Sequence, residues 1–239
     1  MNKSVLIIKG FSKTEEELFT DRKIIQLYID FFTSNAGGCF DLDTEFFIYE
    51  DPELEILQKL EFLNKNDYLI VILVGHGATK DGVQIFQLNE ETIIHPGQLQ
   101  FDCKRQLHII ESCRNIFSST IEIDRLNHFI PKYKYGGIIK EKTLTREESL
   151  QIFNDALRDS SEGVIYLFAC SVDEKAIDYF FLRELITRSV HIHEYFSGGA
   201  YGISNIFEHT KEKVMELSKK RQNPVKIGFG NFPFVITIT

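Results

Sequence analysis

The chain has 239 residues, of which 43% are hydrophobic and 26% are charged, a balance typical of a folded globular protein. Acidic residues outnumber basic ones by 35 to 27, and the net charge of −8 argues against a nucleic-acid-binding protein, which needs a basic surface. Residues 1–10 hold too few apolar side chains for a secretory signal, and no apolar run approaches the roughly 20 residues of a membrane span. We therefore expect a cytoplasmic protein that binds neither nucleic acid nor membranes and keeps its four cysteines reduced.

Short apolar runs alternate with segments of helical periodicity, a pattern typical of a mostly parallel sheet with helices on both faces. The run YLIVILV is apolar at every position and predicts a central strand that is buried on both sides. Strands are expected at residues 5–8, 45–49, 68–74, 107–111 and 164–170, with a hairpin between Gly82 and Pro96 and a last strand in the tail 222–239.

Capping signals predict where the helices begin. A Ser or Thr followed three residues later by Glu forms a capping box at Thr14, Thr145 and Ser171. Asp51, with proline next to it, predicts a further start. Helical spacing of apolar residues predicts a helix over 204–219.

The economical organisation is one domain over residues 1–239, because the chain has no internal repeat and no low-complexity tract. Residues 131–146 differ from the rest in being basic and in containing a pair of glycines. A loop of this length is often functional or disordered, and its plainest interpretation is a solvated surface loop.

Two potentially reactive side chains follow buried strands. Gly75, His76 and Gly77 come directly after strand 68–74, and Cys113 comes just after strand 107–111. In open α/β sheets, ligands bind at the carboxyl ends of the strands, so both groups belong to the functional edge. A nearby imidazole helps a thiol to ionise, and the two can meet if their strands are neighbours.

Along nearly its whole length the chain resembles the caspase/metacaspase superfamily of cysteine endopeptidases. The segments that carry the resemblance are VLIIKGF, VILVGHG, DGVQIFQL, IIESCRN, FACSVDEKA followed by FFLRELI, and QNP with FPFVI in the tail. The caspase pattern has Gln-Ala before the cysteine and Gly after the following Arg, whereas Glu111 and Ser112 here are closer to the Asp-Ser-Cys of metacaspases. The resemblance implies a three-layer caspase-like fold that needs no cofactor and no metal.

The resemblance also implies roles for individual residues. Cys113 would be the nucleophile, and His76 would be the general acid and base. The backbone N–H groups of Gly77 and Cys113 would form the oxyanion hole. Substrates would be proteins or peptides, and control would come from an activating protein or an upstream protease.

Glu111 lies two residues before Cys113, so both side chains face the same way on a strand. A buried carboxylate is costly without a cationic partner, and a structural ion pair with Arg114 or Arg105 is one interpretation. The other is that Glu111 forms the acidic floor of the S1 pocket, as the acid at this place does in metacaspases, so that cleavage follows Arg or Lys. Cleavage after Asp, as in caspases, is the alternative.

A preference for basic residues gives the loop 131–146 a second meaning. Its basic residues become candidate self-processing sites: Lys132, Lys134, Lys140, Lys142 and Arg146. They lie between the nucleophile strand and the next strand, where relatives are often cleaved on activation.

Two rivals to a peptidase differ in kind. The first is a non-catalytic interaction module of caspase fold, against which the presence of both His76 and Cys113 argues. The second is another hydrolase or a metal enzyme that uses His191 and His193, which would face the same side of a strand. No carboxylate or cysteine pattern completes such a metal site, so we expect these histidines to be surface or packing residues.

Overall fold

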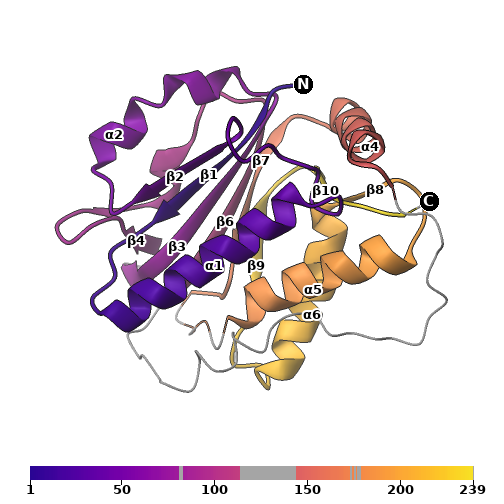
Figure 1. The fold of residues 1–239 in the computed structure, drawn as a ribbon. Coiled ribbons are helices and arrows are strands. Elements are labelled where there is room, and N and C mark those ends of the chain that lie inside the picture. Colours follow the sequence, from indigo (N-terminus) through magenta and orange to yellow (C-terminus); the bar gives the residue numbers. More distant parts are fainter. Residues whose placement is uncertain (81–82, 114–143, 173, 175, 177–178, 239) are drawn as a thin grey trace.

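The computed structural model describes residues 1–80, 83–113, 144–172, 174, 176 and 179–238 (Figure 1). Within these residues the main sheet has eight strands, and its central path runs β2–β1–β3–β6–β7–β9. All neighbours on this path are parallel except β9, which is antiparallel to β7. The strands of the path are β1 (Lys3–Lys9), β2 (Phe46–Glu50), β3 (Tyr68–Lys80), β6 (Arg105–Cys113), β7 (Gly163–Phe168) and β9 (Val225–Gly228).

Four further strands belong to the sheets in the described part of the chain. A hairpin of β4 (Val83–Gln87) and β5 (Ile93–Ile94) pairs with the end of β3, as the sequence predicts for this region. A separate two-stranded sheet joins β8 (Ala200–Gly202) to β10 (Pro233–Ile236).

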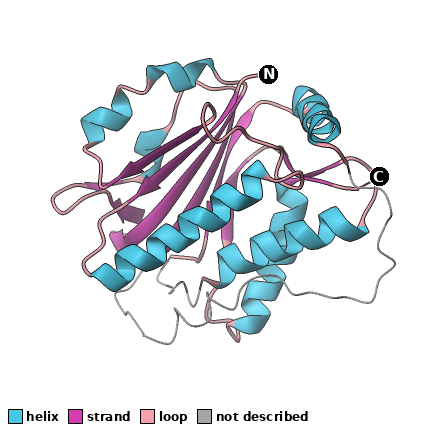
Figure 2. Cartoon of the chain, in the orientation of Figure 1, coloured by secondary structure: helices cyan, strands magenta, loops and turns pink. Residues whose placement is uncertain are grey.

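Helices cover both faces of the main sheet, so the expected three-layer α/β arrangement is confirmed (Figure 2). Among the described residues, one face packs against α1 (Glu15–Thr33), α4 (Arg146–Asp159), α5 (Phe180–Tyr195) and α6 (Ile203–Leu217). The other face packs against shorter elements, which are α2 (Leu54–Gln58) and the 3₁₀ turns η1 (Glu61–Lys65) and η2 (Pro96–Leu99).

Strand β3 shows why its sequence is apolar at every position. Ile70 and Ile72 face the helices of the first layer, whereas Leu69 and Val71 face the shorter elements on the other side. Successive side chains of a strand point to opposite faces, so a strand between two covered faces needs no polar position. The prediction of a central strand buried on both sides is confirmed.

Two predicted helix starts were wrong. Asp51 does not cap α2, which begins at Leu54, because its carboxylate instead accepts hydrogen bonds from the buried ammonium of Lys9 at 2.9 Å. The box at Ser171 does not begin α5, which starts at Phe180; the Glu174 carboxylate accepts from the backbone N–H groups of Ser171 and Asn223. At Asp51 a tertiary contact takes the carboxylate that local sequence assigns to a cap. At Ser171 the local contact with Glu174 does form, but the carboxylate is shared with Asn223 and α5 begins only at Phe180.

Two predicted strand boundaries also changed. Strand β3 does not end at Val74 but continues to Lys80, because its last residues pair with β4. The tail forms two strands rather than one, because Gly228 and Gly230 adopt positive φ and the chain turns away from β7. The capping boxes of α1 and α4 are present as predicted.

Candidate active site

The register of β3 against β6 brings the two predicted reactive residues together. The strands are parallel neighbours, and His76 is the register partner of Cys113, just as Val74 is of Glu111. Neighbouring strands in a sheet lie about 4.8 Å apart. The backbones of His76 and Cys113 are therefore neighbours, at the point where the parallel pairing of β3 and β6 ends.

Backbone conformation and close packing explain why glycine stands on both sides of His76. Gly75 has a φ of 142°, which side-chain-bearing residues rarely adopt. At Gly77 a Cβ would lie 2.5 Å from the Ser112 hydroxyl oxygen and 2.9 Å from the Ile85 carbonyl oxygen. Both glycines thus lie within a longer strand that is packed closely against β4 and β6.

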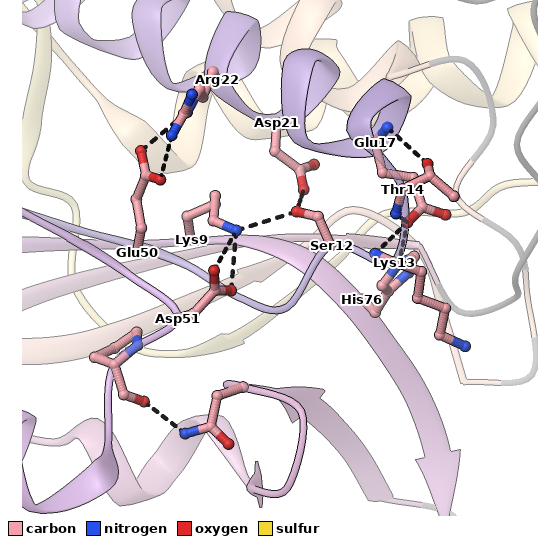
Figure 3. Close-up of polar contacts among 12 residues, drawn as sticks. Lys9, Ser12, Lys13, Thr14, Glu17, Asp21, Arg22, Glu50, Asp51 and His76 are labelled. Carbon is pink, nitrogen blue, oxygen red and sulfur yellow. Dashed lines mark hydrogen bonds and ion pairs between the residues drawn. The ribbon is translucent and has the colours of Figure 1, made fainter.

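His76 contacts a residue of α1 that the sequence marks only as a helix cap. Its Nε2 lies 3.2 Å from Oε2 of Glu17, and the two side chains are 20% and 17% exposed (Figure 3). The same Glu17 oxygen accepts the backbone N–H groups of Lys13 at 2.6 Å and Thr14 at 3.2 Å. Although partial burial acts to raise it, these hydrogen bonds and His76 hold the pKa of Glu17 below its usual value.

A second polar network lies beside this pair (Figure 3). Lys9 at the end of β1 donates to Asp51 and to the Ser12 hydroxyl, which in turn donates to Asp21 at 2.9 Å. Burial raises the pKa of Asp21 to about 6, against the opposing effects of Ser12, Lys9 and His76. Ser12, in the loop between β1 and α1, is therefore held by partly buried polar contacts on both sides.

Glu111 occupies a closed environment. Its side chain is almost covered, since the residue is only 6% exposed, and the Tyr28 hydroxyl of α1 donates to it at 3.0 Å. Burial raises the pKa of Glu111 to about 8, an effect that the Tyr28 hydrogen bond only partly offsets. The interpretation that Glu111 pairs with Arg105 is wrong, because the Arg105 guanidinium donates to Ser160 instead. Arg114, the other candidate partner, lies outside the described residues.

The other described cysteines are buried thiols: Cys39, Cys103 and Cys170. Burial raises the pKa of Cys103 to about 11 and acts in the same direction on Cys39. A buried thiol with a raised pKa is a poor nucleophile, so these environments suit structural roles.

The metal site considered for His191 and His193 rests on a wrong premise. Both residues lie in helix α5, where side chains two apart point to nearly opposite sides, rather than on a strand. His191 packs against the rings of Tyr195 and Phe196, and His193 donates from Nδ1 to the backbone carbonyl of Ile236. Within the described part of the chain, no group of three or more metal-ligating side chains is present.

Most of the candidate self-processing residues lie outside the described residues: Lys132, Lys134, Lys140 and Lys142. Arg146 is described, and it is the first residue of α4. Its guanidinium donates to the carbonyl of Cys39 at 2.9 Å. Cleavage after Arg146 would require the first turn of α4 to unwind, which favours the lysines of the loop.

These features define a caspase-like α/β fold, with a mostly parallel sheet flanked by helices and a His and a Cys on adjacent central strands. Among solved structures, the crystal structure of the Drosophila initiator caspase Dronc is similar, with a TM-score of 0.53 and 11% identity over 97% of this chain and 82% of that chain. No protein-family model and no curated protein matches the sequence. None of the described helices has the length and apolar character that crossing a bilayer demands.

Proposed function

We propose that this protein is a cysteine endopeptidase in which Cys113 is the nucleophile and His76 is the general acid and base. The observation that carries the proposal is the strand register that sets His76 opposite Cys113. Two groups on adjacent strands are within reach of one bound peptide. The caspase-like fold supports the same conclusion.

The chemistry proceeds in two displacements. His76 takes the proton of the Cys113 thiol, and the sulfur attacks the peptide carbonyl carbon to form a C–S bond and an oxyanion. The imidazolium then protonates the amide nitrogen, the C–N bond breaks, and the amine leaves behind a thioester. Water gives a proton to His76 and attacks the thioester, the C–S bond breaks, the acid product leaves, and the proton returns to sulfur.

The backbone N–H groups of Gly77 and Cys113 are the proposed oxyanion donors. Each such donor is worth about 3–4 kcal/mol of transition-state stabilisation in other enzymes. Gly77 follows the proposed base directly on β3, and Cys113 is the register partner of that base on β6, so both backbones lie beside the proposed reaction centre.

We further propose cleavage after Arg or Lys, with Glu111 at the floor of the S1 pocket. This role requires the substrate's cation to reach Glu111 and to take the place of the Tyr28 hydroxyl, with the carboxyl losing its proton. Caspase-like cleavage after Asp is the alternative. If the preference is basic, the loop lysines at 132, 134, 140 and 142 are the proposed self-processing sites.

A panel of fluorogenic peptides with Arg, Lys, Asp or Asn before the cut tests these proposals. Wild type should cleave the Arg and Lys peptides, and Cys113→Ala should cleave none. Equal and negligible rates for both proteins would instead favour a non-catalytic interaction module. Glu111→Gln should lose the basic preference, and an unchanged preference would remove Glu111 from S1.

Alkylation tests the nucleophile without any substrate. Iodoacetamide should modify Cys113 first, because Cys39, Cys103 and Cys170 are buried. Peptide mapping by mass spectrometry identifies the modified residue. Faster labelling of any of the three buried cysteines would contradict the assignment.

On standing, wild type should also be cleaved within residues 131–146, whereas Cys113→Ala should stay intact.

A further inference from the structure

The contact between Glu17 and His76 constrains the imidazole chemically. An ionised carboxylate can only accept hydrogen bonds, so the 3.2 Å contact requires His76 to donate from Nε2. In the neutral ring the proton then sits on Nε2, and the basic lone pair is on Nδ1. The contact with Glu17 of α1 thus leaves Nδ1 as the nitrogen that can take a thiol proton.

The carboxylate is itself held in place. The Glu17 oxygen that contacts His76 also accepts the backbone N–H groups of Lys13 and Thr14, and the Thr14 hydroxyl accepts the N–H of Glu17 in return. A side chain with this many fixed partners has little rotamer freedom left. It therefore offers the imidazole a rigid acceptor rather than a mobile one.

The neighbouring carboxylates have other partners. Asp21 accepts from the Ser12 hydroxyl, and Asp51 accepts from Lys9. Within the described residues, Glu17 is thus the carboxylate that hydrogen-bonds His76.

We propose that Glu17 is a positioning residue for His76, one carboxylate that both caps α1 and fixes the tautomer and orientation of the general base. This inference rests on the proposed peptidase function. During the reaction the ring becomes an imidazolium beside a carboxylate that is mostly shielded from solvent, and this stabilises the charge that forms. Glu17 itself neither gains nor loses a proton.

Three variants separate positioning from helix capping. Glu17→Ala removes the acceptor, Glu17→Gln keeps an acceptor without charge, and Thr14→Ala removes the other half of the cap while leaving Glu17 in place. We expect kcat to fall about 10- to 100-fold in Glu17→Ala with little change in KM, as for other residues that orient a functional histidine. Glu17→Gln should recover part of the loss, and Thr14→Ala should stay within about twofold of wild type.

Equal losses of kcat in Glu17→Ala and Thr14→Ala would overturn the proposal, because capping alone would then explain the effect. An undiminished kcat in Glu17→Ala would overturn it as well.

A spectroscopic measurement tests the contact even if the peptidase proposal fails. In the Cys113→Ala background, His76 should show a downfield, slowly exchanging Nε2–H proton resonance that is absent after Glu17→Ala and retained after Thr14→Ala. Its presence and selective loss would support the positioning contact, whatever the peptide assays give. Its absence in the Cys113→Ala protein would overturn the inference, whereas a failure of the peptidase proposal alone would leave this resonance in place.

Discussion

The buried carboxyl of Glu111 should make the stability of this protein depend on pH in a way that one substitution removes. Glu111 is covered by the sheet and by α1, and its pKa is raised by burial to about 8 from the model-compound value of 4.5. Below about pH 4.5 the group is protonated in the folded and the unfolded chain, so it contributes no difference between them. Above that pH the unfolded chain loses the proton and the folded chain keeps it.

The folded state therefore loses stability, relative to a chain without this group, as the pH rises from about 4.5 to about 8. One proton corresponds to about 1.4 kcal/mol per pH unit, which gives a loss of about 3 kcal/mol between about pH 5 and pH 7. Over the whole interval the effect is on the order of 5 kcal/mol.

Glu111→Gln is the matched variant, because glutamine has nearly the same shape and still offers an oxygen to the Tyr28 hydroxyl. Urea unfolding followed by far-UV circular dichroism suits a chain that lacks tryptophan. The free energy of unfolding of wild type minus that of the variant should fall steadily from about pH 5 to pH 8. This difference cancels the titration of Asp21 and other common groups. A difference that is flat, or that rises with pH, would refute the argument.

Three other substitutions have expected outcomes, each measured by urea unfolding. Tyr28→Phe removes the hydroxyl donor of the buried Glu111 carboxyl and should cost about 1–3 kcal/mol, but almost nothing in a Glu111→Leu background. Asp51→Ala removes the ion-pair partner of the buried Lys9 ammonium and should cost about 1–3 kcal/mol, because Asp51 is itself 43% exposed and Lys9 keeps its hydrogen bond to Ser12. An unchanged free energy of unfolding would mean that solvent reaches Lys9. Gly77→Ala places a Cβ against the Ser112 hydroxyl and the Ile85 carbonyl and should lower the free energy of unfolding by about 1–3 kcal/mol. Any peptidase activity should be lost as well. An unaltered stability would show that β4 can move aside.

The sequence predicted those parts of the fold that depend on local periodicity. The alternation of strand and helix patterns identified the layers, and the uniformly apolar run 68–74 identified the central strand. These predictions succeed because burial on one or both faces imposes a period that a single sequence displays. The boxes at Thr14 and Thr145 succeed for the same reason, since a cap is a contact between residues three apart.

The errors arise where a distant partner overrides a local signal. Gly75 and Gly77 disfavour a strand on their own, yet pairing with β4 extends β3 beyond them. Asp51 resembles a cap until Lys9, on a different strand, takes its carboxylate. The error at His191 and His193 is of another kind, because no distant partner is involved: they have strand spacing, but the apolar residues around them repeat with the period of a helix.

The candidate site was predictable only in part. Local motifs at the ends of buried strands indicated His76 and Cys113. The rule that ligands bind at the carboxyl ends of parallel strands predicted that the two lie at the same end of the sheet. The partners of the site residues come from α1, far away in the chain: Glu17 for His76 and Tyr28 for Glu111. No pattern within a single sequence reports such contacts.

The strand register on which the peptidase proposal depends is itself fixed by burial. Leu107 and Ile109 of β6 belong to the core beneath α1, and Ile110 belongs to the core on the other face. A slip of β6 by one residue against β3 would turn each of these side chains to the wrong face, at a cost of several buried apolar groups. The same slip would set Ser112 or residue 114 opposite His76 in place of Cys113. The apolar residues of β6 therefore hold Cys113, the proposed nucleophile, opposite His76, its proposed base, and one alternating pattern specifies both the core and the candidate site.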